Sequence, residues 1–118
     1  MTKDSITYGP YHATVVAIHD GDTFTLDIDL GFGMKIDLNC RVFGINAPEI
    51  ATQAGKDALD FARQYISPGV ELRVVSHGWD KYGGRFDGAV TLPAGQDFAK
   101  LMLDSGHAKP YSGRGPKT

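Results

Sequence analysis

Apolar and polar residues alternate along several short stretches of the chain, which is the pattern of half-buried β-strands. In residues 23–30, Phe24 and every second residue after it are apolar, and the positions between them are Thr or Asp. Four more stretches alternate or are rich in β-branched residues. They are residues 12–18, 34–45, 70–75 and 85–92. The pattern therefore predicts five strands.

Two other segments repeat their apolar residues at helical spacing. Residues 53–66 follow Thr52, which can cap a helix through its hydroxyl group. Residues 97–105 show the same spacing, and Gly106 follows where a helix commonly ends. We expect a helix in each segment.

The predicted order is three strands, a helix, two strands and a second helix. This order is typical of a mainly β, α+β protein with a five-stranded OB-fold-like barrel and two helices. The alternation breaks at Phe43 and Gly44, which predicts a bulge or a sharp bend. We expect one domain over residues 12–111, with a flexible lead-in over residues 1–11 and a flexible tail over residues 112–118.

Composition narrows the class of protein. The chain has 118 residues, of which 42% are hydrophobic and 22% are charged, as in a single soluble domain. No apolar run approaches the ~18–20 residues of a membrane span, so we expect no membrane partner. The net charge of −2 excludes a strongly basic surface that would bind nucleic acid tightly through its phosphates. Any contact with nucleic acid is expected to be local and weak.

The single cysteine, Cys40, cannot form an internal disulfide. It shares the phase of Leu38 and Val42, so we expect a small buried side chain rather than a reactive one. A reducing compartment fits this usage, and the first residues lack the apolar segment of a secretory signal. We expect a cytoplasmic monomer.

Asp22 is the first candidate for chemistry. It lies in phase with the apolar residues of the strand that follows, so its carboxylate is expected to point inward. A buried carboxylate needs a metal, a cation or an open barrel mouth. The alternative is that residues 20–22, Asp-Gly-Asp, form only a tight turn.

A second cluster begins at Arg41 and ends at Glu49. Oxygen donors from Asp22, Asn46 and a loop carbonyl would suit a hard cation such as calcium. Glu49 could then orient or deprotonate a water molecule beside the metal. The alternative is an ordinary turn over residues 46–49.

The third cluster is Asp-Lys-Tyr-Gly-Gly-Arg, residues 80–85. Arginine side chains match the geometry of phosphate, so Arg41 and Arg85 could clamp one phosphate group. Tyr82 could stack on a base or a sugar. The alternative is an exposed β-turn with a solvated charge pair.

In combination these clusters resemble the staphylococcal nuclease (thermonuclease) family. The resemblance is carried by Asp-Gly-Asp-Thr at 20–23, by Arg41 with the following Pro48-Glu49, and by residues 80–85. Residues 98–109 also look like the last block of that family. The similarity covers roughly residues 12–111.

The resemblance implies a metal-dependent nuclease that hydrolyses DNA and RNA endonucleolytically, with low sequence specificity and 3′-phosphate products. Glu49 would be its general base. The implied catalytic residues are Arg41, Glu49 and Arg85, the calcium ligands are Asp22, Asn46 and the Ala47 carbonyl, and the substrate-binding residues are Asp80, Lys81, Tyr82 and Tyr111.

Two positions depart from the family pattern. Asn46 replaces a metal carboxylate, which predicts weaker metal binding, and Ala47 replaces a threonine. Two alternatives remain open. One is an enzyme that uses Mn²⁺ or Mg²⁺, and the other is a catalytically weak or silent module of this fold that binds nucleic acid or a protein.

Overall fold

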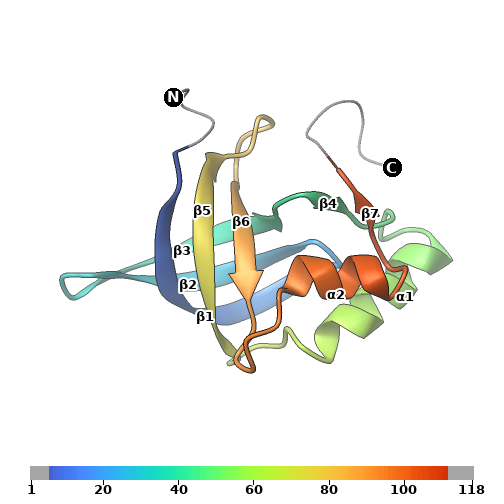
Figure 1. Ribbon diagram of the computed structural model, residues 1–118, viewed down its shortest axis with the longest axis horizontal. Coiled ribbons are helices and arrows are strands. Elements are labelled where there is room, and N and C mark those ends of the chain that lie inside the picture. Colours follow the sequence, from blue (N-terminus) through green and yellow to red (C-terminus); the bar gives the residue numbers. More distant parts are fainter. Residues whose placement is uncertain (1–5, 112–118) are drawn as a thin grey trace.

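Five strands close into a barrel in the computed structural model, which describes residues 6–111 (Figure 1). The strands are β1 (Tyr8–Asp20), β2 (Thr23–Gly31), β3 (Met34–Val42), β5 (Glu71–Trp79) and β6 (Phe86–Thr91). Their order around the barrel is β1-β2-β3-β6-β5. All pairs are antiparallel except β3 and β6, which run parallel and bring Arg41 opposite Asp87.

Two helices and one short strand pair complete the fold. Helix α1 (Gln53–Arg63) precedes β5, and α2 (Phe98–Asp104) follows β6. The short strands β4 (Ile45–Asn46) and β7 (Lys109–Pro110) pair outside the barrel. Both helices lie to the same side of the barrel in Figure 1. The expected α+β architecture, an OB-fold-like five-stranded barrel with two helices, is confirmed.

The core forms where the alternating residues of the strands meet the apolar faces of the helices. Phe24 and Leu26 of β2 are fully buried, and Phe24 meets Phe98 of α2 edge-on, with 5.9 Å between ring centroids. Cys40 is buried in the same core, as its phase predicts. Burial of these side chains is the main force that holds the helices to the barrel.

The expected start of α1 after Thr52 and the expected stop of α2 before Gly106 are present, but α1 ends at Arg63, three residues before the expected end at Ile66. The Thr52 hydroxyl accepts a hydrogen bond from the Gly55 N–H at 3.0 Å, and the Asp97 carboxylate accepts one from the Ala99 N–H at 3.0 Å. Each bond satisfies one amide that has no partner within its helix. Gly106 adopts a positive φ of 80° just after α2, a conformation that favours glycine.

Several boundaries differ from the expectation because strand pairing extends the strands. Strand β1 begins at Tyr8, which pairs with Ser76, so residues 8–11 are not a loose lead-in. Strand β5 continues to Trp79, which pairs with Phe86 beyond a register shift, so it extends past the strand predicted over residues 70–75. The third strand ends at Val42, and the predicted bend follows it. Residues 112–118, the expected tail, lie outside the described residues.

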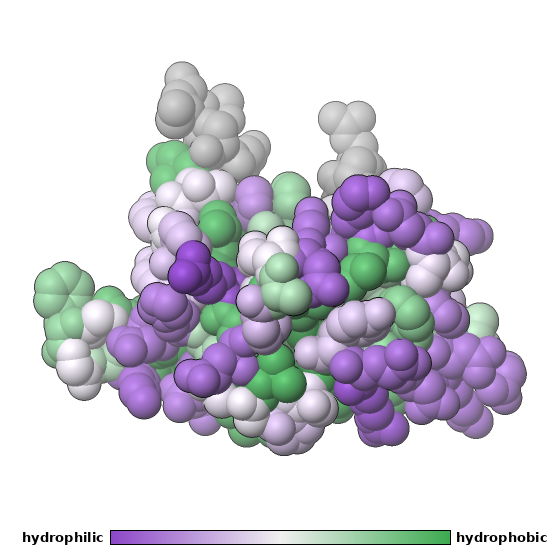
Figure 2. Space-filling view, turned by 60° about the horizontal axis from the view of Figure 1, so that its bottom comes forward, coloured by the Kyte–Doolittle hydropathy of each residue, from purple (hydrophilic) through white to green (hydrophobic). Residues whose placement is uncertain are grey.

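The β2–β3 hairpin projects from the barrel at the left of Figures 1 and 2, and its tip is coloured hydrophobic in Figure 2. Phe32 is 98% exposed there. Among residues 6–111, neither helix has the length and apolar character needed to cross a membrane.

Candidate functional site

Arg41 is the centre of the site. It lies near the end of β3, is 4% exposed, and is fixed by groups that follow it in the chain. Its Nη2 atom donates hydrogen bonds to the Ile45 carbonyl at 3.0 Å and to Asn46 Oδ1 at 2.6 Å. Its Cζ atom lies 4.7 Å from the centre of the Tyr111 ring, within the range of a cation–π contact.

Asp22 lies beside Arg41 and is fully buried, as its phase in the sequence predicts. Its Oδ2 atom accepts a hydrogen bond from the Ala47 N–H at 2.9 Å, and Oδ1 accepts one from the Thr23 hydroxyl at 3.1 Å. Arg41 Nη2 is 4.0 Å from Asp22 Oδ2. The arginine therefore supplies a positive charge for a carboxylate that burial would otherwise destabilise.

Of the three residues expected to hold calcium, Asp22 and Asn46 thus contact the Arg41 guanidinium, and Ala47 is joined to Asp22 through its amide. Their chemistry fits the metal, because calcium prefers carboxylate, amide and backbone oxygens. Asn46 Oδ1 already accepts from Arg41, so a cation bound there would share or replace that hydrogen bond. Within residues 6–111 no three His, Cys, Asp or Glu side chains form a metal-binding group. Asp22 would be the single carboxylate of the expected set.

Asp80 connects the two arginines. Its Oδ2 atom lies 4.0 Å from Arg41 Nε and 3.5 Å from Arg85 Nε. Its Oδ1 atom accepts a hydrogen bond from the Tyr82 N–H at 2.9 Å, which holds the turn between β5 and β6. The guanidiniums of Arg41, in β3, and of Arg85, in the turn that precedes β6, thus converge on a single carboxylate oxygen.

Asp87 belongs to the same cluster and was not among the expected residues. Burial raises its pKa to about 7, and the neighbouring Asp80 adds to this through a hydrogen bond and its charge. Burial also acts to raise the pKa of Asp80, but its hydrogen bonds with Tyr82 and Asp87 and the nearby arginines bring it below the usual value. The pair therefore shares its charge unequally, and Asp87 holds the proton. Its alternation with Arg85 in the strand predicted over residues 85–92 is the sequence signal that could have identified it.

A cleft of about 490 Å³ opens beside this cluster. Its lining includes Arg41, Asp80 and Asp87 together with aromatic side chains. Phe43 and His77 stack with 3.7 Å between their ring centroids, and burial lowers the pKa of His77. The remaining lining residues are Gly44, Trp79, Lys81, Tyr82 and Tyr111. Five of the lining residues were not among the expected site residues: Phe43, Gly44, His77, Trp79 and Asp87.

Two expected catalytic residues do not line the cleft. Glu49 is exposed in the loop after β4, where its carbonyl accepts hydrogen bonds from the amide and the hydroxyl of Thr52. Arg85 contacts Asp80 without lining the cleft, and its Nε atom is buried without a hydrogen-bond partner in the described part of the chain. The structure thus brings together Arg41, Asp80, Lys81, Tyr82 and Tyr111 in the cleft, and Asp22, Asn46 and Ala47 behind Arg41.

A comparison with protein-family models finds no family that matches the chain, and a search of curated proteins finds no match either. The functional interpretation therefore depends on the geometry of this site together with the motifs of the sequence.

Proposed function

We propose that the protein is a nuclease, a phosphodiesterase that cleaves DNA or RNA with low sequence specificity. The observation that carries the proposal is the convergence of Arg41 and Arg85 on Asp80 Oδ2 at the edge of an aromatic cleft. Guanidiniums bind phosphate strongly, and aromatic side chains stack on bases of any sequence. Both features are expected of a site that binds a nucleic-acid strand without reading its sequence.

The two arginines would bind the scissile phosphate and stabilise the charge that develops on its oxygens. Such stabilisation is effective when the donors are held in place before the reaction. Arg41 meets this condition through its bonds to Ile45 and Asn46. The Nε–H of Arg85 makes no hydrogen bond within the described residues, although it lies 3.5 Å from Asp80 Oδ2, and a phosphate oxygen could accept from it in place of Asp80.

Glu49 would accept the proton of the attacking water, a role that its exposure to solvent permits. Asp22, Asn46 and the Ala47 carbonyl would hold a calcium ion, with Mn²⁺ or Mg²⁺ as the alternatives. When bound, the ion would supply additional positive charge for the phosphate oxygens. We propose endonucleolytic cleavage that leaves 3′-phosphates, on the strength of the sequence resemblance.

A second function is favoured by one observation. Asp22 is fully buried and Asn46 is 5% exposed, and both already have hydrogen-bond partners inside the protein. If Arg41 permanently replaces the metal, the protein would be a catalytically silent module that binds nucleic acid or a protein partner through the same cleft.

Degradation of single-stranded DNA separates the two functions. We expect cleavage with calcium, loss of cleavage in chelator, and a loss of at least about 100-fold in Glu49→Gln, the typical contribution of a general base. Asp57→Asn, an exposed carboxylate on α1, is the matched control and should retain full activity. If the wild-type protein binds DNA but does not cleave it with calcium, manganese or magnesium, the nuclease proposal is wrong and the binding module stands.

A further inference from the structure

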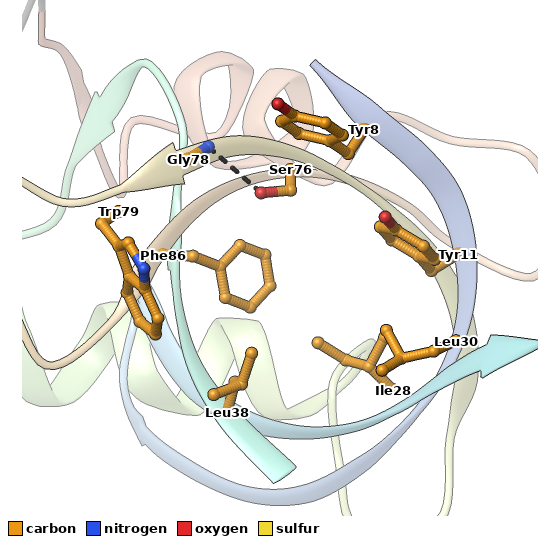
Figure 3. A pocket seen from close by; sticks show the side chains of 9 residues that line it. All are labelled: Tyr8, Tyr11, Ile28, Leu30, Leu38, Ser76, Gly78, Trp79 and Phe86. Carbon is orange, nitrogen blue, oxygen red and sulfur yellow. Dashed lines mark hydrogen bonds between the residues drawn. The ribbon is translucent and has the colours of Figure 1, made fainter. Parts of the chain in front are cut away.

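One end of the barrel opens into a second cavity, of about 300 Å³, which the proposed chemistry does not use (Figure 3). It lies where β1 begins and where β2 and β5 end. We call it the barrel mouth, and its lining residues are Tyr8, Tyr11, Ile28, Leu30, Leu38, Ser76, Gly78, Trp79 and Phe86. None of these nine residues is charged.

The walls of the barrel mouth suit a flat, neutral ligand. In Figure 3, Trp79 and Phe86 stand on one side of the opening, and Tyr8 and Tyr11 stand on the other. The volume is at the lower end of the range for pockets that bind small molecules. The Ser76 hydroxyl accepts a hydrogen bond from the Gly78 N–H at 3.1 Å, which fixes the rim beside Trp79.

The barrel mouth and the arginine cleft are neighbours, because Trp79 lines both of them. Trp79 is 67% exposed, an unusual state for so large an apolar side chain. Because this ring borders the cleft, a strand whose phosphate is held by Arg41 can reach it. The nucleotide next to that phosphate is then the nearest group that could enter the mouth.

We propose that the barrel mouth binds one nucleobase of the strand whose phosphate lies in the arginine cleft. A base is planar and uncharged at neutral pH, and its stacking on aromatic side chains is largely independent of sequence. To enter the mouth the base must leave its own stack, so the site favours single-stranded or locally opened substrate. This proposal rests on the proposed function, because it takes the occupant from the ligand of the adjacent cleft.

The experiment uses the Glu49→Gln protein, so that substrate is not consumed, and follows the fluorescence of Trp79, the single tryptophan of the chain. The ligands are trithymidylate and the three derivatives in which one base is removed. We expect one abasic position to raise Kd by about 5- to 150-fold, which is the effect of stacking one base. If removal of each base in turn leaves Kd unchanged, the mouth does not bind a base.

Two exposed tyrosines provide a matched pair of variants. Tyr8 lines only the barrel mouth and is 55% exposed, and Tyr82 lines only the cleft and is 63% exposed. We expect Tyr8→Ala to raise Kd for intact trithymidylate by about fivefold and to leave Kd for the sensitive abasic ligand unchanged. Tyr82→Ala should raise Kd for both ligands by the same factor. Equal weakening of both ligands by Tyr8→Ala would overturn the proposal.

The outcomes separate this proposal from the proposed function. If the wild-type protein binds no oligonucleotide, the proposed function itself fails. If the protein binds and cleaves DNA while Tyr8→Ala and the abasic ligands have no effect, the barrel-mouth proposal alone fails. A dimer in sedimentation that Tyr8→Ala abolishes and trithymidylate does not affect would also overturn it, because a second copy would then fill the mouth.

Discussion

Arg41 combines a structural role with a functional one. It is buried between Asp22 and Asp80, and its removal would leave the Asp22 carboxylate in the interior without a compensating charge. Loss of activity in an Arg41 variant would therefore not identify a phosphate contact. Arg85 is the better probe, because its side chain is 25% exposed and Asp80 keeps Arg41 as a partner when Arg85 is changed.

Asp87 should make the binding of anions in the cleft depend on pH. The groups that face it are the carboxylate of Asp80, the guanidiniums of Arg41 and Arg85, and the buried thiol of Cys40. Because burial and the charge of Asp80 raise its pKa to about 7, Asp87 is neutral below that pH and negative above it. The added negative charge competes with a phosphate for the arginines. We expect the affinity for a phosphodiester to fall by roughly tenfold as the pH rises from 6 to 8.

The measurement is a titration of a dithymidine phosphodiester, whose own charge does not change between these pH values. Asp87→Asn is the informative variant, and its affinity should be independent of pH at the level that the wild-type protein reaches at pH 6. Asp97→Asn serves as a control away from the cleft and should keep the wild-type dependence. The interpretation is wrong if Asp87→Asn shows the same fall in affinity as the wild-type protein.

At the scale of elements, helix α1 fixes the loop that follows β4 and carries Glu49. The Thr52 hydroxyl caps α1 and also donates a hydrogen bond to the Glu49 carbonyl at 2.6 Å. One side chain therefore binds both the loop and the helix. Gly55 lies directly against the same carbonyl, and a Cβ atom added there would overlap the Glu49 carbonyl oxygen. The close approach leaves room only for glycine at this position of the helix.

Gly55→Ala should consequently destabilise the protein, although alanine is the better helix former by about 1 kcal/mol. Overpacking against a backbone atom typically costs about 1–3 kcal/mol and shifts the backbone, so we expect a net loss of about 1–2 kcal/mol in the free energy of unfolding. Urea denaturation measures this change in the free energy of unfolding. Lys56→Ala, at the next and exposed helix position, should change stability by less than about 0.5 kcal/mol. Stabilisation by Gly55→Ala would show that the loop is not held against α1.

The elements also show which features the sequence could predict. The alternation in β2, the Thr52 cap and the inward phase of Asp22 are local signals, and each is confirmed. The neighbourhood of Arg41 and Asp87 depends on the parallel pairing of β3 with β6, which joins distant parts of the chain. The raised pKa of Asp87 follows from that pairing and from burial. Residue types alone could therefore predict neither the contact between Arg41 and Asp87 nor this pKa.

The same limit applies to the boundaries of strands. Gly9 and Pro10 indicate a turn when they are considered alone, but pairing of Tyr8 with Ser76 of β5 extends the strand across them. Trp79 lies beyond residues 70–75, where the sequence pattern predicts a strand, yet its pairing with Phe86 places it in β5. This residue borders both cavities, so the barrel mouth could not be recognised before the barrel was closed.

At the scale of the whole molecule, the distribution of charge limits how strongly any nucleic acid can bind. The chain has a net charge of −2, and residues 1–40 contain six acidic and two basic residues. The cleft offers Arg41, Lys81 and the adjacent Arg85 to phosphates. Affinity for a polyanion therefore has to come from two or three local ion contacts together with stacking.

This arrangement predicts a shallow dependence of binding on salt. Each phosphate neutralised on a single strand contributes about −0.7 to the slope of log K against log salt concentration, so two or three contacts give a slope of about −1.4 to −2.1. The measurement is binding of Glu49→Gln to oligothymidylate at several KCl concentrations and constant calcium. Lys81→Ala should reduce the slope by about 0.7, and Lys35→Ala, in the acidic β2–β3 hairpin, should leave it unchanged. A wild-type slope of about −4 or steeper would contradict a local site, because it would require a basic surface that extends well beyond the cleft. A slope in the expected range would instead mean that most of the affinity at physiological salt comes from the aromatic side chains that line the cleft and the barrel mouth.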